Sequence, residues 1–188
     1  MAGGIAELAR AACGEISACF ERVDEGQVAA LVEALAAARR IVLHGVGREG
    51  LMMRALTMRL FHMGLDAHVA GDMTTPPVGP GDLLVSSAGP GNFSTVMALI
   101  GTAKAAGARV AVVTAQPSGE AARAADLALC LPAQTMADDR AAGASPILSM
   151  GSAYEGAQYV MFEILVLRLR ERLGVSPEAM RDRHTNLE

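Results

Sequence analysis

Residues 41–50 read IVLHGVGREG, a short apolar run that ends in closely spaced glycines. Such a run before glycines is typical of a buried strand and a tight turn. The stretch that follows, 50–63, is long enough for a helix, and its Leu, Met and Phe residues leave little polar face. The sequence therefore predicts a strand, a glycine turn and a covering helix at this point.

The same alternation continues along the chain. Further strands are predicted at 65–70, 83–87, 109–114 and 127–131, with helices at 93–106 and 119–124. Two Ala-rich amphipathic helices, 4–21 and 25–39, precede the first strand, and a long helix, 152–173, and a short one after Ser176 follow the last. Strands that alternate with helices predict a parallel sheet covered on both faces.

The 188 residues are predicted to form a single domain, 1–188. Its parts are N-terminal helices (1–39), a sheet core (40–131), a loop without clear periodicity (132–146), and C-terminal helices and a tail (147–188). The loop is open to two interpretations, a lid over a ligand site or a disordered connector. The helix 152–173 is apolar almost all round from Val160 to Leu169, which predicts a subunit interface.

Composition argues against several classes of protein. The net charge of -4, without a basic stripe, argues against nucleic-acid binding. No run approaches the ~20 apolar residues of a membrane span, and no stretch resembles a signal peptide. Cys13, Cys19 and Cys130 lack CxxC spacing and predict buried free thiols in a reducing compartment. We therefore expect a cytoplasmic protein with no membrane or nucleic-acid partner.

Two glycine loops follow strands and are candidate ligand-binding turns. Gly45–Gly50 matches GxGxxG, the context of a dinucleotide fingerprint, and Asp66 lies near the spacing of a ribose ligand. A tight strand-to-helix turn explains the same pattern. Arg48 and Glu49 also place bulky charged groups where a pyrophosphate requires bare backbone, so no nucleotide cofactor is predicted.

The second loop reads SSAGPGNFST at 86–95 and precedes another predicted helix. Free N–H groups at a helix N-terminus bind anions, although a structural turn is again the alternative. Two such loops at adjacent strand ends predict a ligand crevice at the carboxyl edge of the sheet. The candidate substrate-binding residues of the two loops are Gly47, Arg48, Glu49, Ser86, Ser87, Gly89, Gly91, Asn92, Ser94 and Thr95.

Proton-transfer groups are few, with 4 histidines in the chain. Glu155 opens the long C-terminal helix, and His184 lies in the polar tail. Moving a carbonyl between adjacent carbons requires a base that removes a proton and returns it through an enediol. A carboxylate whose pKa is raised by burial can do both, and an imidazole can shuttle the oxygen-bound proton. A first-turn carboxylate and a frayed tail residue, both without a catalytic role, are the alternatives.

Several segments together resemble the SIS (sugar isomerase) domain family, most closely its 6-phospho-3-hexuloisomerase branch, over nearly the whole length. The matching segments are Gly45–Arg48, Thr57–Leu60, His62–Gly64, Ala67–Val69, Thr75–Pro77, Gly81–Leu83, Met150–Ser152, Glu155 and Arg183–Glu188. The resemblance implies a flavodoxin-like three-layer sandwich with a five-stranded parallel sheet and helical extensions at both ends. It also implies a homodimer or homotetramer with shared active sites.

The activity that the resemblance implies is interconversion of a 3-ketohexose 6-phosphate and fructose 6-phosphate, without metal or other cofactor. Glu155 corresponds to the family's proposed proton acceptor. His184 corresponds to a terminal histidine that reaches a neighbouring subunit's site. The expected partner is a small sugar or sugar phosphate.

The phosphate loops depart from the family pattern. The family has Ser at the position of Glu49 and Ser-Gly-Ser-Gly-Glu-Thr where this chain reads AGPGNF at 88–93. A carboxylate about 4 Å from a phosphate charge costs about 4 kcal/mol at an effective dielectric of about 20. We therefore expect Glu49 to turn away from the ligand or to pair with Arg48 or Arg54. An isomerase or binding protein for a non-phosphorylated or amino sugar, and a non-catalytic sugar-binding module, stay open as alternatives.

Overall fold

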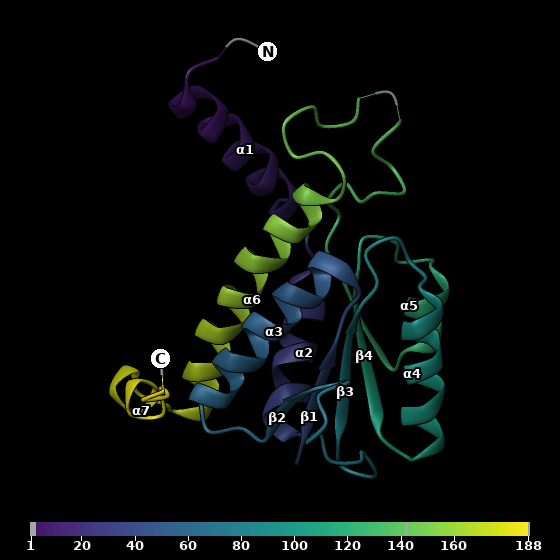
Figure 1. Cartoon of the computed structure of the whole chain (residues 1–188), viewed down its shortest axis with the longest axis vertical. Coiled ribbons are helices and arrows are strands. Elements are labelled where there is room, and N and C mark those ends of the chain that lie inside the picture. The colour runs from purple at the N-terminus through teal and green to yellow at the C-terminus, as the bar shows by residue number, and fades with distance from the viewer. Residues whose placement is uncertain (1–2, 142, 188) are drawn as a thin grey trace.

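Five parallel strands form the central layer of a computed structural model that describes residues 3–141 and 143–187 (Figure 1). They are β1 (Ile41–His44), β2 (Ala67–Val69), β3 (Leu83–Ser87), β4 (Arg109–Thr114) and β5 (Leu127–Cys130). Their order in the sheet is β2-β1-β3-β4-β5, and each neighbouring pair is parallel. This is the strand order of flavodoxin-like folds, so the predicted fold class is confirmed.

Helices cover both faces of the sheet (Figure 1). The helices α2 (Glu25–Ala37), α3 (Gly47–His62) and α6 (Ser152–Leu173) lie on one face, and α4 (Ser94–Ala105) and α5 (Glu120–Ala124) on the other. Leu43 and Val85 point into the first layer, whereas Val42 and Leu84 point into the second. Burial on both faces explains why the strands read as continuous apolar runs.

Two further helices extend the sandwich at its ends. The first, α1 (Ile5–Phe20), packs on α6 and projects beyond the sheet, and α7 (Pro177–Asp182) follows the far end of α6 (Figure 1). A Cβ on Gly156 would lie 2.8 Å from Cδ1 of Ile16, so glycine lets α1 and α6 approach closely. Ser176 caps α7 by accepting a hydrogen bond from the amide of Ala179.

The predicted elements all form, with some ends displaced. The bounds of α6 agree with the predicted 152–173. The helix α3 begins at Gly47 rather than at 50, because part of the glycine turn belongs to its first turn. The helix α2 ends at Ala37 rather than at 39, since the amide of Arg39 bonds to the carbonyl oxygen of Gly81 beside the sheet. The second strand is shorter than predicted.

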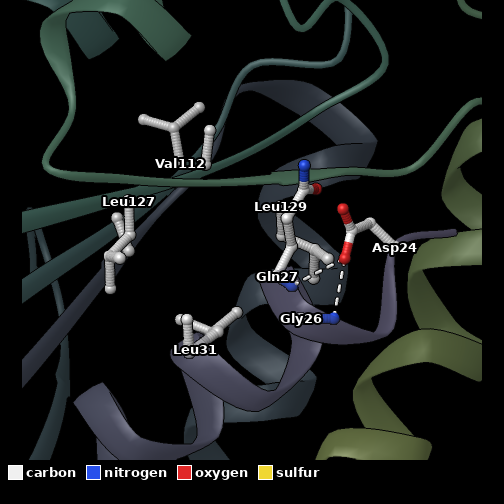
Figure 2. Close-up of a pocket in the computed structure, with 10 residues that line it drawn as sticks. Asp24, Gly26, Gln27, Leu31, Val112, Leu127 and Leu129 are labelled. Atoms are coloured by element: carbon white, nitrogen blue, oxygen red, sulfur yellow. Dashed lines mark hydrogen bonds between the residues drawn. The ribbon is translucent and has the colours of Figure 1, made fainter.

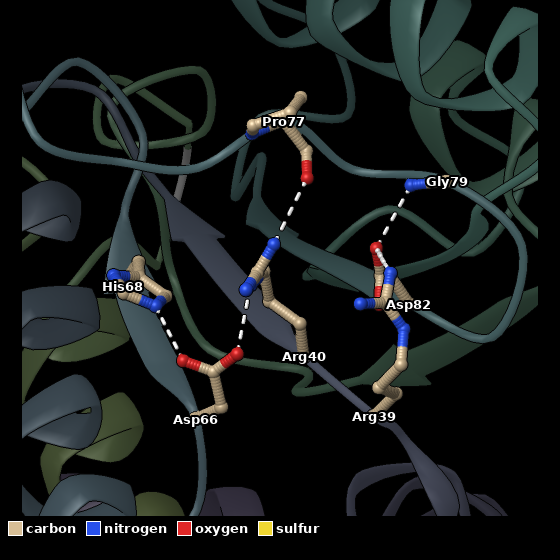
Figure 3. Close-up of polar contacts among 7 residues, drawn as sticks. All are labelled: Arg39, Arg40, Asp66, His68, Pro77, Gly79 and Asp82. Carbon is tan, nitrogen blue, oxygen red and sulfur yellow. Dashed lines mark hydrogen bonds and ion pairs between the residues drawn. The ribbon is translucent and has the colours of Figure 1, made fainter.

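Ion pairs fix the start of β1 to its neighbours (Figure 3). Arg39 pairs with the buried Asp82 at 2.8 Å, and Arg40 pairs with Asp66 at 2.8 Å. Asp66 also lies 2.6 Å from Nε2 of His68. Asp66 is thus engaged just before β2, at the amino ends of the strands. A ribose ligand would bind at the opposite edge of the sheet, at the strand carboxyl ends.

Among the described residues, no helix has the length and apolar character needed to cross a membrane. The three cysteines are free, and Cys19 is buried as predicted. Cys13 is exposed, against the prediction, because α1 projects away from the rest of the domain.

Candidate active site

The turn after β1 brings the start of α3 against the carboxyl end of the sheet. A Cβ on Gly50 would lie 2.5 Å from the carbonyl oxygen of Gly45, so this close approach requires glycine. Gly47 has a φ of 60°, in the left-handed region that favours glycine. The GxGxxG pattern is thus accounted for by a tight strand-to-helix turn.

A cavity of about 370 Å³ opens at this edge. Its walls include the turn after β1, Pro90 and Phe93 of the loop after β3, and Tyr154 and Glu155 of α6. The chain leaves β1 toward β2 on one side, while β3 pairs with β1 on the other. The cavity therefore lies at the switch point where open α/β sheets bind their ligands.

Glu155 stands in the first turn of α6 with its side chain 12% exposed. Nη2 of Arg48 lies 2.6 Å from its Oε2, and the same guanidinium donates to Oγ of Ser152 at 3.2 Å. Burial raises the pKa of Glu155, while the charge of Arg48 opposes that rise. A raised pKa makes the ionised carboxylate a stronger base, which suits removal of a proton from carbon.

Glu49 turns into the protein and is 8% exposed. Its Oε2 accepts a short hydrogen bond from the hydroxyl of Ser87 and another from the amide of Gly89 at 3.0 Å. Burial raises the pKa of Glu49, these two hydrogen bonds lower it, and the charge of Glu155 raises it. The net shift is upward, which favours the neutral carboxylic acid.

The prediction that Glu49 pairs with Arg48 or Arg54 is wrong. Arg48 pairs with Glu155, and Arg54 pairs with Asp72 at 3.0 Å. Successive helical residues point about 100° apart, so Glu49 faces the sheet where Arg48 faces α6. Glu49 instead finds its partners in Ser87 and Gly89.

The end of β3 and the loop after it engage several of their polar groups within the protein. Ser86 is fully buried and alternates with Val85, so it points to the α4 face of the sheet. The hydroxyl of Ser87 bonds to Glu49. Asn92 donates to Glu120 at 2.6 Å. A Cβ on Gly91, which has a φ of 90°, would lie 2.9 Å from Cβ of Gln116.

Of the predicted binding residues, the cavity brings together Gly47, Arg48 and Glu49. The amide of Gly89 donates to Glu49. Ser94 and Thr95 begin α4 with exposed side chains. The binding roles of the loop residues stay predictions.

A family model for the SIS domain matches residues 34–158, which include the sheet, both glycine loops and the start of α6. The chain belongs to the SIS domain family. The predicted resemblance is confirmed.

Relatives of this SIS chain carry a more specific name. A 3-hexulose-6-phosphate isomerase from Mycobacterium gastri is 37% identical over 93% of this chain and 86% of the relative. One from Bacillus subtilis (strain 168) is 32% identical over 84% of this chain and 85% of the relative. A solved structure gives a similar match. It is a hypothetical protein from Methanococcus jannaschii, whose crystal structure was taken to infer a function of 3-hexulose-6-phosphate isomerase. It is 25% identical to this chain with a TM-score of 0.83, over 97% of this chain and 99% of the other.

His184 lies at the other end of this SIS domain. Its ring stacks on that of His62, with centroids 5.1 Å apart, at the C-terminal end of α3. Glu49 and His62 lie about 20 Å apart along α3, at roughly 1.5 Å per residue. His184 lines a cavity with His62 of α3, Arg170 of α6 and Met180 of α7, near the end of α6 opposite Glu155. A shared site would need His184 of another copy, and that role stays a prediction.

Tyr154 and Gln158, which connect the SIS cavity to the core, were not among the predicted site residues. Nε2 of Gln158 donates to Oγ of Ser87 at 2.7 Å, and the Tyr154 hydroxyl lies 3.4 Å from the same oxygen. Burial raises the pKa of Tyr154 well above its ordinary value, so its phenol stays neutral. The available signal was two polar side chains four residues apart on one face of an apolar helix.

A second cavity of this SIS domain, about 260 Å³, lies between α2 and β5 (Figure 2). Its walls are largely aliphatic and include Leu31, Leu127 and Leu129. The carboxylate of Asp24 accepts hydrogen bonds from the amides of Gly26 and Gln27 and so caps α2. This cavity is a poor candidate for proton transfer, and the cavity at the strand ends is the candidate active site.

In the described part of the chain, no group of three or more His, Cys, Asp or Glu side chains is placed to hold a metal ion. The expectation that this SIS domain works without metal or other cofactor stays a prediction.

Proposed function

We propose that this SIS domain is a sugar-phosphate isomerase that interconverts a 3-ketohexose 6-phosphate and fructose 6-phosphate through an enediol. The observation that carries the proposal is the Glu155 carboxylate, partly buried in a cavity at the switch point and paired with Arg48 at 2.6 Å. The relatives named 3-hexulose-6-phosphate isomerase, at 37% and 32% identity, support the class of substrate.

The chemistry follows from the position of one base. Glu155 takes the proton from the carbon beside the carbonyl, and the electron pair of that bond forms the carbon–carbon double bond of the enediol. The carbonyl oxygen gains a proton at the same time. Glu155 then returns its proton to the former carbonyl carbon while the hydroxyl on the other enediol carbon loses its proton and becomes the new carbonyl, so the same carboxylate serves both half-reactions.

We place the phosphate at the amino end of α4, where Ser94 and Thr95 are exposed and the first amides of the helix are available to an anion. The amide of Gly89 is already bonded to Glu49. Phosphate affinity should therefore depend on the hydroxyls of Ser94 and Thr95 more than on the glycines of the loop.

We also propose that copies of the chain associate through α3 and α6. Both helices expose large apolar side chains, among them Leu51, Met58 and Phe61 of α3 and Tyr159 and Leu167 of α6. His184 stacks against α3 and would then approach the cavity of a neighbouring copy.

The direct test incubates the protein with fructose 6-phosphate labelled with ¹³C at its carbonyl carbon and follows the label by NMR. The proposal expects the labelled carbonyl to become a hydroxyl-bearing carbon while a new carbonyl appears at the neighbouring C3. Formation of glucose 6-phosphate instead would assign an aldose–ketose reaction. No change of the label, with a folded protein, would reject the isomerase function.

A second candidate is a sugar without phosphate, because the carboxyl group of Glu49 occupies the Gly89 amide in the anion loop. Thermal unfolding in the presence of fructose and of fructose 6-phosphate separates the two, since a ligand that binds the native state raises the melting temperature. A shift with fructose but none with fructose 6-phosphate would favour this candidate.

A further inference from the structure

Glu49 is held in an orientation that suits a proton donor. Both of its recorded hydrogen bonds fall on Oε2, from the Ser87 hydroxyl and the Gly89 amide. Gln158 donates to the Ser87 oxygen at 2.7 Å, which leaves the hydroxyl hydrogen of Ser87 for Glu49. A neutral carboxyl group bonded in this way uses Oε2 as its carbonyl oxygen, so Oε1 carries the proton.

The charges of the cavity favour that neutral form. Among the described residues that line the cavity, Arg48 is the one with a positive charge, and it is paired with Glu155 at 2.6 Å. The groups that face Glu49 from the other elements are the neutral Ser87 and Tyr154 and the acidic Glu155. Two carboxyl groups in one cavity titrate as a pair, and the one beside a cation ionises first.

We propose that Glu49 is a second catalytic residue of this cavity, the acid that protonates the substrate's carbonyl oxygen while Glu155 removes the carbon-bound proton. The inference rests on the proposed isomerase function and adds the group that handles the oxygen-bound proton. It assigns different tasks to two carboxyl groups in different surroundings: Glu155 is paired with Arg48, and Glu49 is bonded to the neutral groups of Ser87 and Gly89.

The proton balance closes without another reactant. In the first half-reaction the carbon–hydrogen bond breaks and its proton passes to Glu155, while the Oε1–H bond of Glu49 breaks and its proton passes to the carbonyl oxygen. The product is the enediol. In the second half-reaction the other enediol hydroxyl returns a proton to Glu49, and Glu155 returns its proton to the adjacent carbon.

A purely structural role predicts different behaviour on substitution. In Glu49→Gln the amide oxygen can still accept from Ser87 and Gly89, so the loop stays held. The amide cannot supply a proton to the substrate. Glu33→Gln is the matched control, because Glu33 lies on α2 and pairs with Arg172 at 2.8 Å, away from the cavity.

The kinetic experiment compares wild type, Glu49→Gln and Glu33→Gln on fructose 6-phosphate across pH. Loss of a general acid costs about 100-fold or more in kcat. We expect that loss in Glu49→Gln, with KM changed less than about threefold and the alkaline limb of the kcat profile removed. If Glu49→Gln keeps the wild-type kcat, the role of Glu49 is overturned and the isomerase function stands. If the wild type is inactive on the sugar phosphate, both the isomerase function and the role of Glu49 are overturned.

Infrared spectroscopy tests the neutral carboxyl group without relying on turnover. We expect a protonated-carboxyl C=O band at neutral pH in wild type and in Glu33→Gln, and its loss in Glu49→Gln. If Glu49→Gln does not fold, the wild-type spectrum still tests the inference. Absence of the band from wild type at neutral pH would overturn the inference, because an ionised Glu49 has no proton to give.

Discussion

The guanidinium of Arg48 and the carboxylate of Glu155 form an ion pair of 2.6 Å that joins the first turn of α3 to the first turn of α6. These helices are far apart in the sequence, and their amino ends meet over the carboxyl edge of the sheet. The pair gives Glu155 a counter-charge that its neighbour Glu49 lacks. The division of proton-transfer roles in the cavity follows from that difference.

Replacement of Arg48 by Gln should move the acid limb of kcat/KM to higher pH. Burial raises the pKa of Glu155 and Arg48 opposes that rise, so removing Arg48 raises the pKa further. The base then becomes active only at higher pH. Arg54→Gln, which removes a guanidinium paired with Asp72 on the same helix, is the control. Identical acid limbs in the Arg48 variant and wild type would contradict this account.

The sheet and its covering helices could be predicted because their signals are local. Apolar runs bounded by glycine and the long apolar helix 152–173 set the elements and their alternation, and these set the parallel sheet. The partner of Glu49 could not be predicted, since it depends on which way one first-turn side chain turns. Likewise, the position of His184 relative to a catalytic cavity depends on how copies assemble.

Glu49→Gln should become more stable relative to wild type as pH rises. The folded-state pKa of Glu49 is raised, so wild type has its full stability below the ordinary pKa of glutamate and loses stability as pH rises through the folded-state value. The glutamine variant has no such loss. The difference in melting temperature should therefore grow above about pH 4.3 and then level off. A difference that is constant with pH would show that Glu49 is not destabilised by ionisation.

Gly89→Ala should unfold more readily in urea, by about 1–3 kcal/mol. The new Cβ would lie 2.8 Å from Oε1 of Glu49 and 2.8 Å from Cε1 of Tyr154, so both walls of the cavity must shift. Gly101→Ala is the control, because a Cβ there meets no other atom within 4 Å and lies inside α4. That control should be neutral or up to about 1 kcal/mol more stable. Equal stabilities of the two variants would refute the close packing around Gly89.

His184→Ala and Glu155→Gln should each be inactive alone and recover activity when mixed, if sites are shared between copies. A dimer that contains one chain of each kind keeps one site with both original residues. After random exchange of equal amounts, about half of the dimers are mixed and each mixed dimer has one intact site of two. About a quarter of wild-type activity should therefore return. Tagged chains verify that exchange has occurred. Mixed assemblies without recovered activity would remove His184 from the site.

The central claim is that Glu155 exchanges a proton with the substrate's carbon, and deuterium incorporation measures this most directly. Fructose 6-phosphate incubated with the protein in D₂O should acquire deuterium at C3, and Glu155→Gln should abolish that exchange while the sugar phosphate still raises the variant's melting temperature. Exchange at C3 that persists undiminished in Glu155→Gln would contradict the account.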